Sequence, residues 1–305
     1  ISDANPGAKW PLADYELLPT MAIVDADYMM NLPPKATQAS GYDVLTHAVE
    51  AYVSVFASDY TNGFALTAIK NVFKYLPRAY KYGAKDEEAR IKMADASCLA
   101  GIAFANAMLG VNHSLAHKLG GWHHIPHGTA NALLFPFVCR FNAQRHPYKM
   151  GTFSQYKYPQ AFERYVELGE LIGVKGKTEE QTFENWIKAC EQLKKDIDIP
   201  ETILAWLLEA HPEKSAEEWE AEFLAAVDQM AEWAFHDACT GCNPVYPTIG
   251  ELKGCYLKAF YGEKKYAEKY GNIWEVQVSP PTETHAAYPM GLSADLGVDK
   301  TGGFN

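Results

Sequence analysis

Apolar residues at helical spacing run through most of this chain of 305 residues and predict a mainly α-helical fold. The pattern begins at Lys35 and persists almost to residue 262. Thr178 and Ser215, each followed by acidic residues, are typical of helix starts. The third predicted helix is apolar on nearly all sides, which favours a central place in a helical bundle. We expect helices at 35–56, 61–82, 86–109, 112–120, 128–143, 159–173, 178–195, 216–237 and 248–261.

The two ends of the chain differ from this helical region. Only two short apolar segments, 1–4 and 20–27, have strand character, and turn-forming residues bound them. We therefore expect an α/β segment over 1–33, a helical domain over 34–262, and an irregular tail over 263–305, which is rich in Pro, Gly, Ser and Thr. No apolar run approaches the ~20 residues of a membrane span.

Charge and cysteine content exclude several classes of protein. The formal net charge of -11 leaves no basic stripe for a nucleic-acid partner. Six cysteines in 305 residues do not make the disulfide framework of a small secreted domain. Cys239 and Cys242 form a single CxxC, which we interpret as two incidental thiols. The first residues do not resemble a signal peptide, so we expect a cytoplasmic protein.

Asp43 and His47 lie four residues apart in the predicted helix 35–56. Both side chains therefore project from one helix face, one turn apart, where they can bind one ion from a rigid backbone. The flanking residues are largely apolar, so we expect the pair to face inward. A buried carboxylate beside an imidazole requires a compensating partner, because unpaired burial is costly.

A second segment, 113–128, contains five of the ten histidines of the chain. His113 and His117 are again four residues apart, and His127 follows Pro126 at the start of the next predicted helix. A helix–turn–helix hairpin can bring His127 back beside His113 or His117. His123 and His124 lie in the predicted turn, where we expect exposed bystanders.

Three imidazoles and one carboxylate form a donor set suited to Fe(II), Zn(II), Co or Mn. A purely structural zinc site would more often use thiolates, so the set favours an ion with one position open for a substrate. Two other readings stay open at this point. The histidines can be a pH-responsive cluster, or they can gather in the turn by chance.

The segments GYDVLTHAVEAY and LGVNHSLAHKLGGWHHIPHGTANALL resemble the two signature segments of the iron-dependent (group III) alcohol dehydrogenases. Their sequences are most similar to the alcohol dehydrogenase part of bifunctional aldehyde–alcohol dehydrogenases. AKWPLADYELLPTMAIVDAD, TFSQYKYPQA, CTGCNP and YPTIGELK also match that branch. The resemblance covers roughly residues 1–262 and implies the helical metal-binding domain of the dehydroquinate synthase-like fold.

The resemblance also implies roles for individual residues. The family's metal ligands, one Asp and three His, correspond to Asp43, His47, His113 and His127. His117 corresponds to a histidine close to the nicotinamide, with either a proton-shuttle role or a role as a hydrogen-bond donor. Lys9, in GAKWPL, occupies the position of a lysine that contacts the dinucleotide.

The activity implied by the resemblance is interconversion of a short primary alcohol and its aldehyde, such as ethanol and acetaldehyde. The implied cofactors are NAD and Fe(2+), with Zn(2+) as an alternative ion, and the implied partners are further copies of the chain, with filaments in the full-length protein. Phe104, Phe135 and Trp122 are candidates to line a small apolar pocket, although aromatics at helical spacing are more often core.

Two departures from the family pattern raise rival hypotheses. No GGGS, GxGxxG or Walker sequence appears, so we expect a fragment in which 1–33 is the remnant of a dinucleotide-binding domain. Val245 stands where the family often has Arg. The rivals are a catalytically silent structural or assembly module and a related polyol or lactaldehyde reductase. A metal-storage bundle would require Glu-x-x-His pairs on several helices, which the chain lacks.

Overall fold

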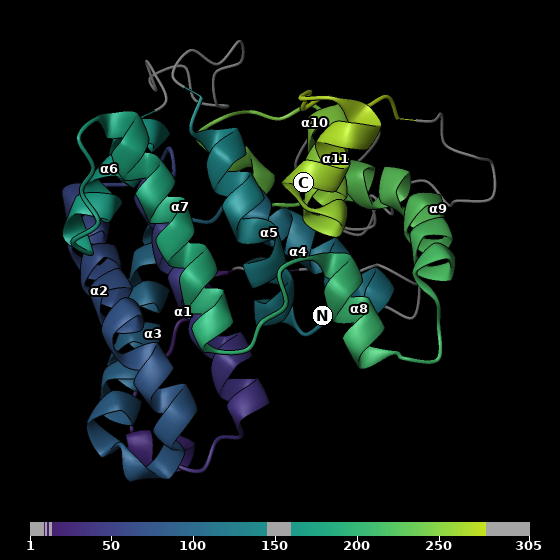
Figure 1. Ribbon diagram of the computed structural model, residues 1–305. Helices are drawn as coiled ribbons and strands as arrows, with labels where there is room; N and C mark the ends of the chain where they lie inside the picture. Colours follow the sequence, from purple (N-terminus) through teal and green to yellow (C-terminus); the bar gives the residue numbers. More distant parts are fainter. Residues whose placement is uncertain (1–8, 10, 12–13, 145–159, 279–305) are drawn as a thin grey trace, which may run out of the picture.

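The computed structural model describes residues 9, 11, 14–144 and 160–278 (Figure 1). These residues are mainly helical, which confirms the predicted fold class. Four short 3-10 helices cover Tyr15–Leu17 (η1), Ala26–Met29 (η2), Gly83–Lys85 (η3) and Thr240–Cys242 (η4). The α-helices are α1 (Pro34–Val53), α2 (Asp59–Tyr82), α3 (Glu87–Ala107), α4 (Val111–His123), α5 (His127–Asn142), α6 (Ala161–Leu171), α7 (Glu179–Asp196), α8 (Ile203–Ala210), α9 (Ala216–Phe235), α10 (Ile249–Tyr261) and α11 (Glu263–Tyr270).

The helices form two groups that meet along α1, α4 and α5. Helix α1 packs against α2 and α3 on one side and against α5 on the other. Helix α4 packs against α5 and α9, while α10 packs against α5, α9 and α11. Figure 1 shows α2, α3, α6 and α7 at the left and α8 to α11 at the right, with α4 and α5 between them. The two histidine-bearing segments therefore lie where the groups join.

Helix α5, and not α3, is the most central helix of the described region, which corrects the prediction for the third helix. Almost every residue of α5 is buried. In α3 the buried face consists mainly of alanines, while Ile91 and Ile102 on the other face are 39% and 41% exposed. The small alanine side chains bring α3 close to α1 and α2. The opposite face of α3 is not covered by a further layer of described helices, so its apolar side chains stay partly exposed.

The two ends of the described chain also differ from expectation. Residues 20–27 form no strand but an extended segment that ends in η2, and the range 1–4 lies outside the described residues. A strand needs a neighbouring strand to pair its backbone groups, and the described part of this segment has none. Its apolar side chains are consequently exposed, with Ile23 at 85% and Met21 at 76%.

The range 263–270, expected to be irregular, forms α11. Residues 271–278 then cross α10 closely, because a Cβ on Gly254 would lie 1.9 Å from the Trp274 carbonyl oxygen. Helix α8 was also missed by the sequence pattern, since its eight residues span only two turns.

The predicted helix starts are confirmed for α7 and α9. Thr178 accepts a hydrogen bond from the Gln181 amide, and Ser215 forms a capping box with Glu218. Across the described ranges no single helix is long and apolar enough to cross a membrane. One bent pair, α3 with α4, meets that criterion by length and composition only.

Candidate metal centre

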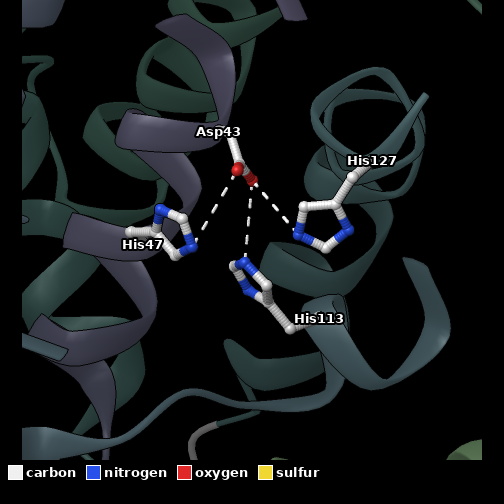
Figure 2. A group of neighbouring side chains, drawn as sticks. All are labelled: Asp43, His47, His113 and His127. Carbon is white, nitrogen blue, oxygen red and sulfur yellow. Dashed lines mark ion pairs between the residues drawn. The ribbon is translucent and has the colours of Figure 1, made fainter. Parts of the chain in front are cut away.

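Four side chains predicted as metal ligands converge between α1, α4 and α5 (Figure 2). Asp43 and His47 project from one face of α1, His113 comes from the first turn of α4, and His127 is the first residue of α5. The Asp43 carboxylate oxygens lie 3.9 Å from His47 Nε2, 3.6 Å from His113 Nε2 and 3.7 Å from His127 Nε2. The structure thus gathers residues 84 positions apart around one point.

The spacing of these donor atoms fits a single transition-metal ion. All four potential ligand atoms lie within 4.8 Å of one another. Tetrahedral ligands at about 2.1 Å from a metal ion are about 3.4 Å apart, so the distances from Asp43 are only slightly wider than that. One carboxylate oxygen and three imidazole nitrogens suit Fe(II) or Zn(II). That these residues bind an ion stays a prediction.

The exposure of the four side chains leaves the group open on one side. His113 is 1% exposed, whereas the His127 side chain is 32% exposed. Burial lowers the pKa of His47 to about 3 and that of His127 to about 4, so both imidazoles are neutral near pH 7. Neutral imidazole is the form that binds a metal ion.

The two carboxylates beside His113 have the opposite effect. Burial alone would lower the pKa of His113, but hydrogen bonds to Asp43 and Glu50 raise it to about 9. Burial alone would raise the pKa of Asp43, but the hydrogen bond to His113 and the nearby imidazoles hold it well below its usual range. The group therefore has an excess of negative charge that favours a bound cation.

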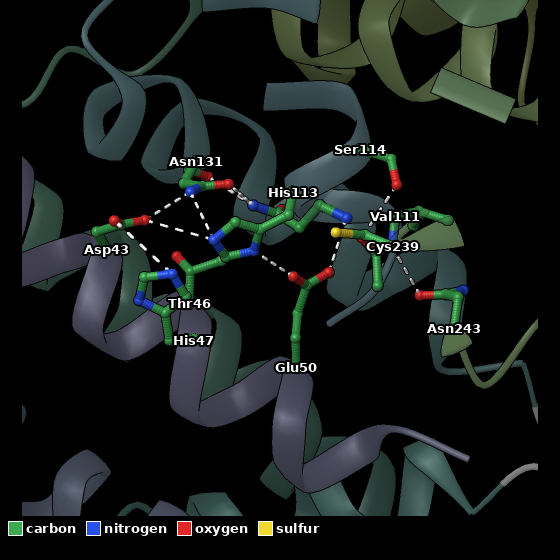
Figure 3. A network of polar contacts seen from close by, with 12 residues as sticks. Asp43, Thr46, His47, Glu50, Val111, His113, Ser114, Asn131, Cys239 and Asn243 are labelled. Atoms are coloured by element: carbon green, nitrogen blue, oxygen red, sulfur yellow. Dashed lines mark hydrogen bonds and ion pairs between the residues drawn. The ribbon is translucent and has the colours of Figure 1, made fainter. Parts of the chain in front are cut away.

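Glu50 is a residue of the candidate centre that the sequence reasoning missed. Its Oε2 lies 2.5 Å from His113 Nδ1, and its Oε1 accepts a hydrogen bond of 2.7 Å from the Asn112 amide (Figure 3). An ionised carboxylate can only accept, so His113 donates through Nδ1. When His113 is neutral, as metal binding requires, the lone pair is therefore on Nε2, which faces Asp43. The signal was present in the sequence, because Glu50 follows Asp43 by seven residues on the same face of α1.

Asn131 was missed as well. Its side-chain amide nitrogen, Nδ2, lies 2.6 Å from Asp43 Oδ1, 3.2 Å from His113 Nε2 and 3.3 Å from His127 Nε2. The side chain of Asn112 donates to Asn131 Oδ1 at 2.9 Å and fixes the orientation of this amide. Asn131 follows His127 by one helical turn on α5, which is the spacing that could have identified it.

A close approach between α1 and α5 brings His127 to Asp43. A Cβ on Gly128 would lie 1.9 Å from the Ala39 carbonyl oxygen and 3.1 Å from Asp43 Cβ. Any larger residue at this position would push the start of α5 away from α1. Gly128 therefore sets the distance across which His127 and Asp43 face each other.

His117 lies beside the four-residue group but belongs to a second cluster with Asp237 and Cys239. Its ring stacks on that of His127, with centroids 5.4 Å apart and planes at 14°. His117 Nδ1 lies 2.9 Å from Asp237 Oδ2. His113 and His117 therefore lie in different clusters, and the assignment of His113 as a ligand stays a prediction.

The second cluster already contains its own cation. Lys118 Nζ lies 2.8 Å from Asp237 Oδ2, and both side chains are fully buried. Burial, followed by the nearby Asp237 charge, raises the pKa of the Cys239 thiol well above its usual value, so the thiol stays neutral. A metal ion is disfavoured here, because the Lys118 ammonium group already neutralises the Asp237 carboxylate.

Lys9 lies in the same neighbourhood. Its backbone carbonyl accepts a hydrogen bond of 3.0 Å from Lys118 Nζ. Its ammonium group lies against Gly120, where a Cβ would be 3.6 Å from Nζ. The structure therefore brings the predicted dinucleotide contacts, Lys9 and His117, to one side of α4.

The three aromatic candidates have different surroundings. Phe104 stacks on His47 with ring centroids 4.5 Å apart, so it borders the candidate centre. Phe135 is 1% exposed and packs edge-on against Tyr42, which places it in the core. Trp122 packs against Trp233.

Two smaller expectations also have an outcome. His124 is exposed, but His123 is 4% exposed and stacks on Phe223, so its prediction as an exposed bystander was wrong. Val245 is buried in the core, and Cys239 and Cys242 are both free thiols.

Comparisons with known proteins show which family this chain resembles. The model of the Fe-containing alcohol dehydrogenase family, C-terminal part, matches residues 37–260. Aldehyde-alcohol dehydrogenase of Clostridium acetobutylicum is 46% identical over 260 residues, which cover 85% of this chain and 29% of that protein. Bifunctional aldehyde-alcohol dehydrogenase AdhE of Escherichia coli K12 is 47% identical over 270 residues, covering 88% of this chain and 29% of that protein.

A solved structure supports the same relationship. The iron-containing alcohol dehydrogenase from Thermococcus thioreducens aligns with a TM-score of 0.68 at 35% identity. The alignment covers 82% of this chain and 57% of that chain. The present chain spans 29% of the length of the two curated relatives.

Proposed function

Because the chain belongs to the iron-containing alcohol dehydrogenase family, we propose that it binds Fe(II) and interconverts a short primary alcohol with its aldehyde. The observation that carries this proposal is the convergence of Asp43, His47, His113 and His127 within 4.8 Å. Ethanol and acetaldehyde are the proposed substrate pair, and NAD is the proposed hydride carrier. Zn(II) is the alternative ion for the same donor set.

The protein's own residues support this chemistry in three ways. Asp43 and the three imidazoles hold the ion, and Glu50 keeps His113 in the tautomer that can bind it. The side bordered by His127 is the more exposed one, and it gives a small substrate access to the centre. When bound, the ion supplies Lewis-acid polarisation of a substrate oxygen, and the dinucleotide supplies the hydride acceptor or donor.

His117 and Lys9 are the proposed residues on the dinucleotide side. His117 lies against His127, and its Nδ1 donates to Asp237, so its Nε2 is the atom proposed to pass the alcohol proton to solvent. The Lys9 ammonium, near Gly120, offers a positive charge to an anionic group of the dinucleotide. We therefore expect both residues to contribute to NADH binding.

Metal content tests the proposal directly. After anaerobic loading with iron, we expect about one ion per chain by elemental analysis. The double variant His113→Ala, His127→Ala should retain almost none, because it removes two of the four donors. His211→Ala is the matched control, since His211 lies outside the group and is half-exposed. Equal metal content in parent and double variant would refute the proposed centre.

Turnover is the second test. The iron-loaded protein should form NADH from ethanol and NAD, and the double variant should lose this activity together with its metal. A protein that binds one ion per chain but neither binds NADH nor turns over ethanol would support the rival hypothesis of a silent structural module. A preference for diols or lactaldehyde would instead indicate the reductase branch.

We also propose that the chain assembles with further copies of itself. The support is a row of exposed apolar side chains before α1, in which Ile23, Met21 and Tyr28 are 85%, 76% and 90% exposed. Apolar patches of this kind are typical of covered surfaces. Light scattering measures the assembly, and Met21→Ser with Ile23→Ser should reduce its mass.

A further inference from the structure

A buried carboxylate, Asp237, links two residues of the proposed reaction. Its side chain is fully buried just beyond the end of α9. Asp237 Oδ2 lies 2.9 Å from His117 Nδ1 and 2.8 Å from Lys118 Nζ. Asp237 Oδ1 accepts a hydrogen bond of 3.1 Å from the Cys239 amide. One oxygen atom therefore receives two consecutive side chains of α4.

We propose that the ion pair between Asp237 and Lys118 is a positioning device that fixes His117 and Lys9 for the proposed reaction. The inference rests on the proposed function, because it concerns how the dinucleotide side of that site is held. Neither Asp237 nor Lys118 is placed in contact with substrate or metal. Both act through the residues that they hold.

The first consequence concerns the tautomer of His117. An ionised carboxylate can only accept hydrogen bonds, so the His117 ring must donate through Nδ1. Its Nε2 then carries the lone pair and becomes the atom that exchanges a proton with a substrate hydroxyl. The parallel stacking of His117 on His127 restrains the rotation of the ring as well.

The second consequence concerns Lys9. Lys118 is 1% exposed, and its ammonium group reaches Asp237 and the Lys9 carbonyl oxygen at 3.0 Å. This hydrogen bond ties the backbone of Lys9 to α4, next to Gly120. The same ion pair thus fixes the residue proposed to contact the dinucleotide and the residue proposed to carry the proton.

A core ion pair with only a structural role would not require these two contacts. Consecutive helix residues point about 100° apart, so His117 and Lys118 share one oxygen only because Asp237 lies between them. The arrangement therefore couples the orientation of His117 to that of the lysine that anchors Lys9.

The tautomer of His117 tests this inference without relying on activity. We would label the histidine ring nitrogens with 15N in the zinc-loaded, diamagnetic protein and record two-bond correlation spectra near pH 9. The loss of one set of signals in His117→Gln assigns His117. In the parent we expect Nδ1 to be protonated and Nε2 to be unprotonated.

Variants then remove the ion pair between Asp237 and Lys118. The double variant Asp237→Leu, Lys118→Met replaces both charges by apolar groups of similar size, so no buried charge is left unpaired. His117 should then change to the Nε2–H form, which histidine favours in water. Asp237→Glu keeps a carboxylate and should keep the parental tautomer. Asp86→Asn is the matched control, because Asp86 pairs with Arg78 far from this site.

Kinetics provide the second readout. In the double variant we expect kcat to fall about 100-fold and the KM for the dinucleotide to rise about 10-fold, with metal content unchanged. A protonated Nε2 in the parent would overturn the inference, and so would an unchanged tautomer in the double variant. A lower unfolding midpoint with unchanged kcat and KM would mean that the ion pair is only structural.

The outcomes separate this inference from the proposed function. A parent that binds no metal or forms no NADH refutes the proposed function, but its His117 tautomer still shows whether Asp237 holds the ring. A parent that is active while its His117 tautomer is independent of Asp237 refutes only the positioning role. If the double variant does not fold, the parental spectrum alone still decides the first point.

Discussion

Two carboxylate–imidazole pairs lie close together in this protein, and they differ in the sign of the charged side chain beside them. Glu50 holds His113 at 2.5 Å, and Asp237 holds His117 at 2.9 Å. Both carboxylates are nearly inaccessible to solvent. His113 faces a second carboxylate, Asp43, at 3.6 Å, whereas Asp237 faces the Lys118 ammonium at 2.8 Å.

The comparison shows how one pair of side-chain types supports two different uses. Beside Asp43 the local charge is negative, so a bound cation would compensate the buried carboxylates. Beside Lys118 the charge is balanced within the chain, so the pair orients an imidazole without needing an ion. The charged group beside each histidine–carboxylate pair, Asp43 in one cluster and Lys118 in the other, decides whether the cluster is suited to a metal ion.

The largest expected effect comes from removing the Lys118 ammonium group beside Asp237. Lys118→Met leaves the buried Asp237 carboxylate without a lysine, with His117 and the Cys239 amide as its hydrogen-bond partners, and we expect the free energy of unfolding to fall by about 3–5 kcal/mol. Urea unfolding at neutral pH measures it. The variant should also be stabilised by added Zn(II) more than the parent is, because the second cluster then lacks its own cation.

An exposed ion pair provides the control for this variant. Lys35 lies 3.4 Å from Glu209, and both side chains are more than 60% exposed. Lys35→Met should therefore change the free energy of unfolding by no more than about 1 kcal/mol. Equal losses for Lys118→Met and Lys35→Met would contradict the charge balance inferred for Asp237.

The next effect tests the other pair. Glu50→Gln keeps an oxygen for the Asn112 amide but removes the charge beside His113, and we expect metal affinity to fall about 10- to 100-fold. Competition with a chelator, followed by Co(II) absorbance, measures the affinity. Glu184→Gln is the matched control, because Glu184 pairs with Arg140 away from the centre. An unchanged affinity in Glu50→Gln would show that Glu50 does not support the ligand.

The sequence predicted the parts of this site that depend on helical spacing. Asp43 and His47 are four residues apart, and His113, His117 and His127 lie in a recognisable helix–turn–helix segment, so local periodicity marked them as candidates. The choice of His113 over His117 came from the family resemblance. Glu50 follows Asp43 by seven residues, and Asn131 follows His127 by four, so both also lie at helical spacing from a predicted ligand. They were missed because Glu and Asn at helical positions are common and carry no chemical signal of their own.

Asp237 and the path of the chain ends could not be predicted in this way. Asp237 is 120 residues from His117, and only the packing of α9 on α4 brings them together. Residues 20–27 have the composition of a strand, but a strand forms only where another strand pairs with it. Tertiary neighbours decide both features, and one sequence does not contain them explicitly.

His123 offers a third case, a buried imidazole with no carboxylate partner. It stacks on Phe223, and neither ring nitrogen has a hydrogen-bond partner among the described residues. Burial lowers its pKa to about 4 and outweighs the opposing charge of Glu222, while the nearby charges of His124 and Lys214 lower the pKa further. The folded state therefore binds fewer protons at His123 than the unfolded state between about pH 4 and 6.5.

This difference gives the smallest predicted effect, a loss of stability in acid. As the pH falls from about 7 to about 5, His123 should cost the folded state about 1–2 kcal/mol, because the unfolded imidazole gains a proton that the folded one does not. His123→Phe should remove this part of the pH dependence, although overpacking can add a cost that is the same at every pH. Urea unfolding of both proteins at several pH values measures the difference. Identical pH profiles would mean that His123 gains a compensating partner on protonation, and the distinction between paired and unpaired buried histidines would then fail.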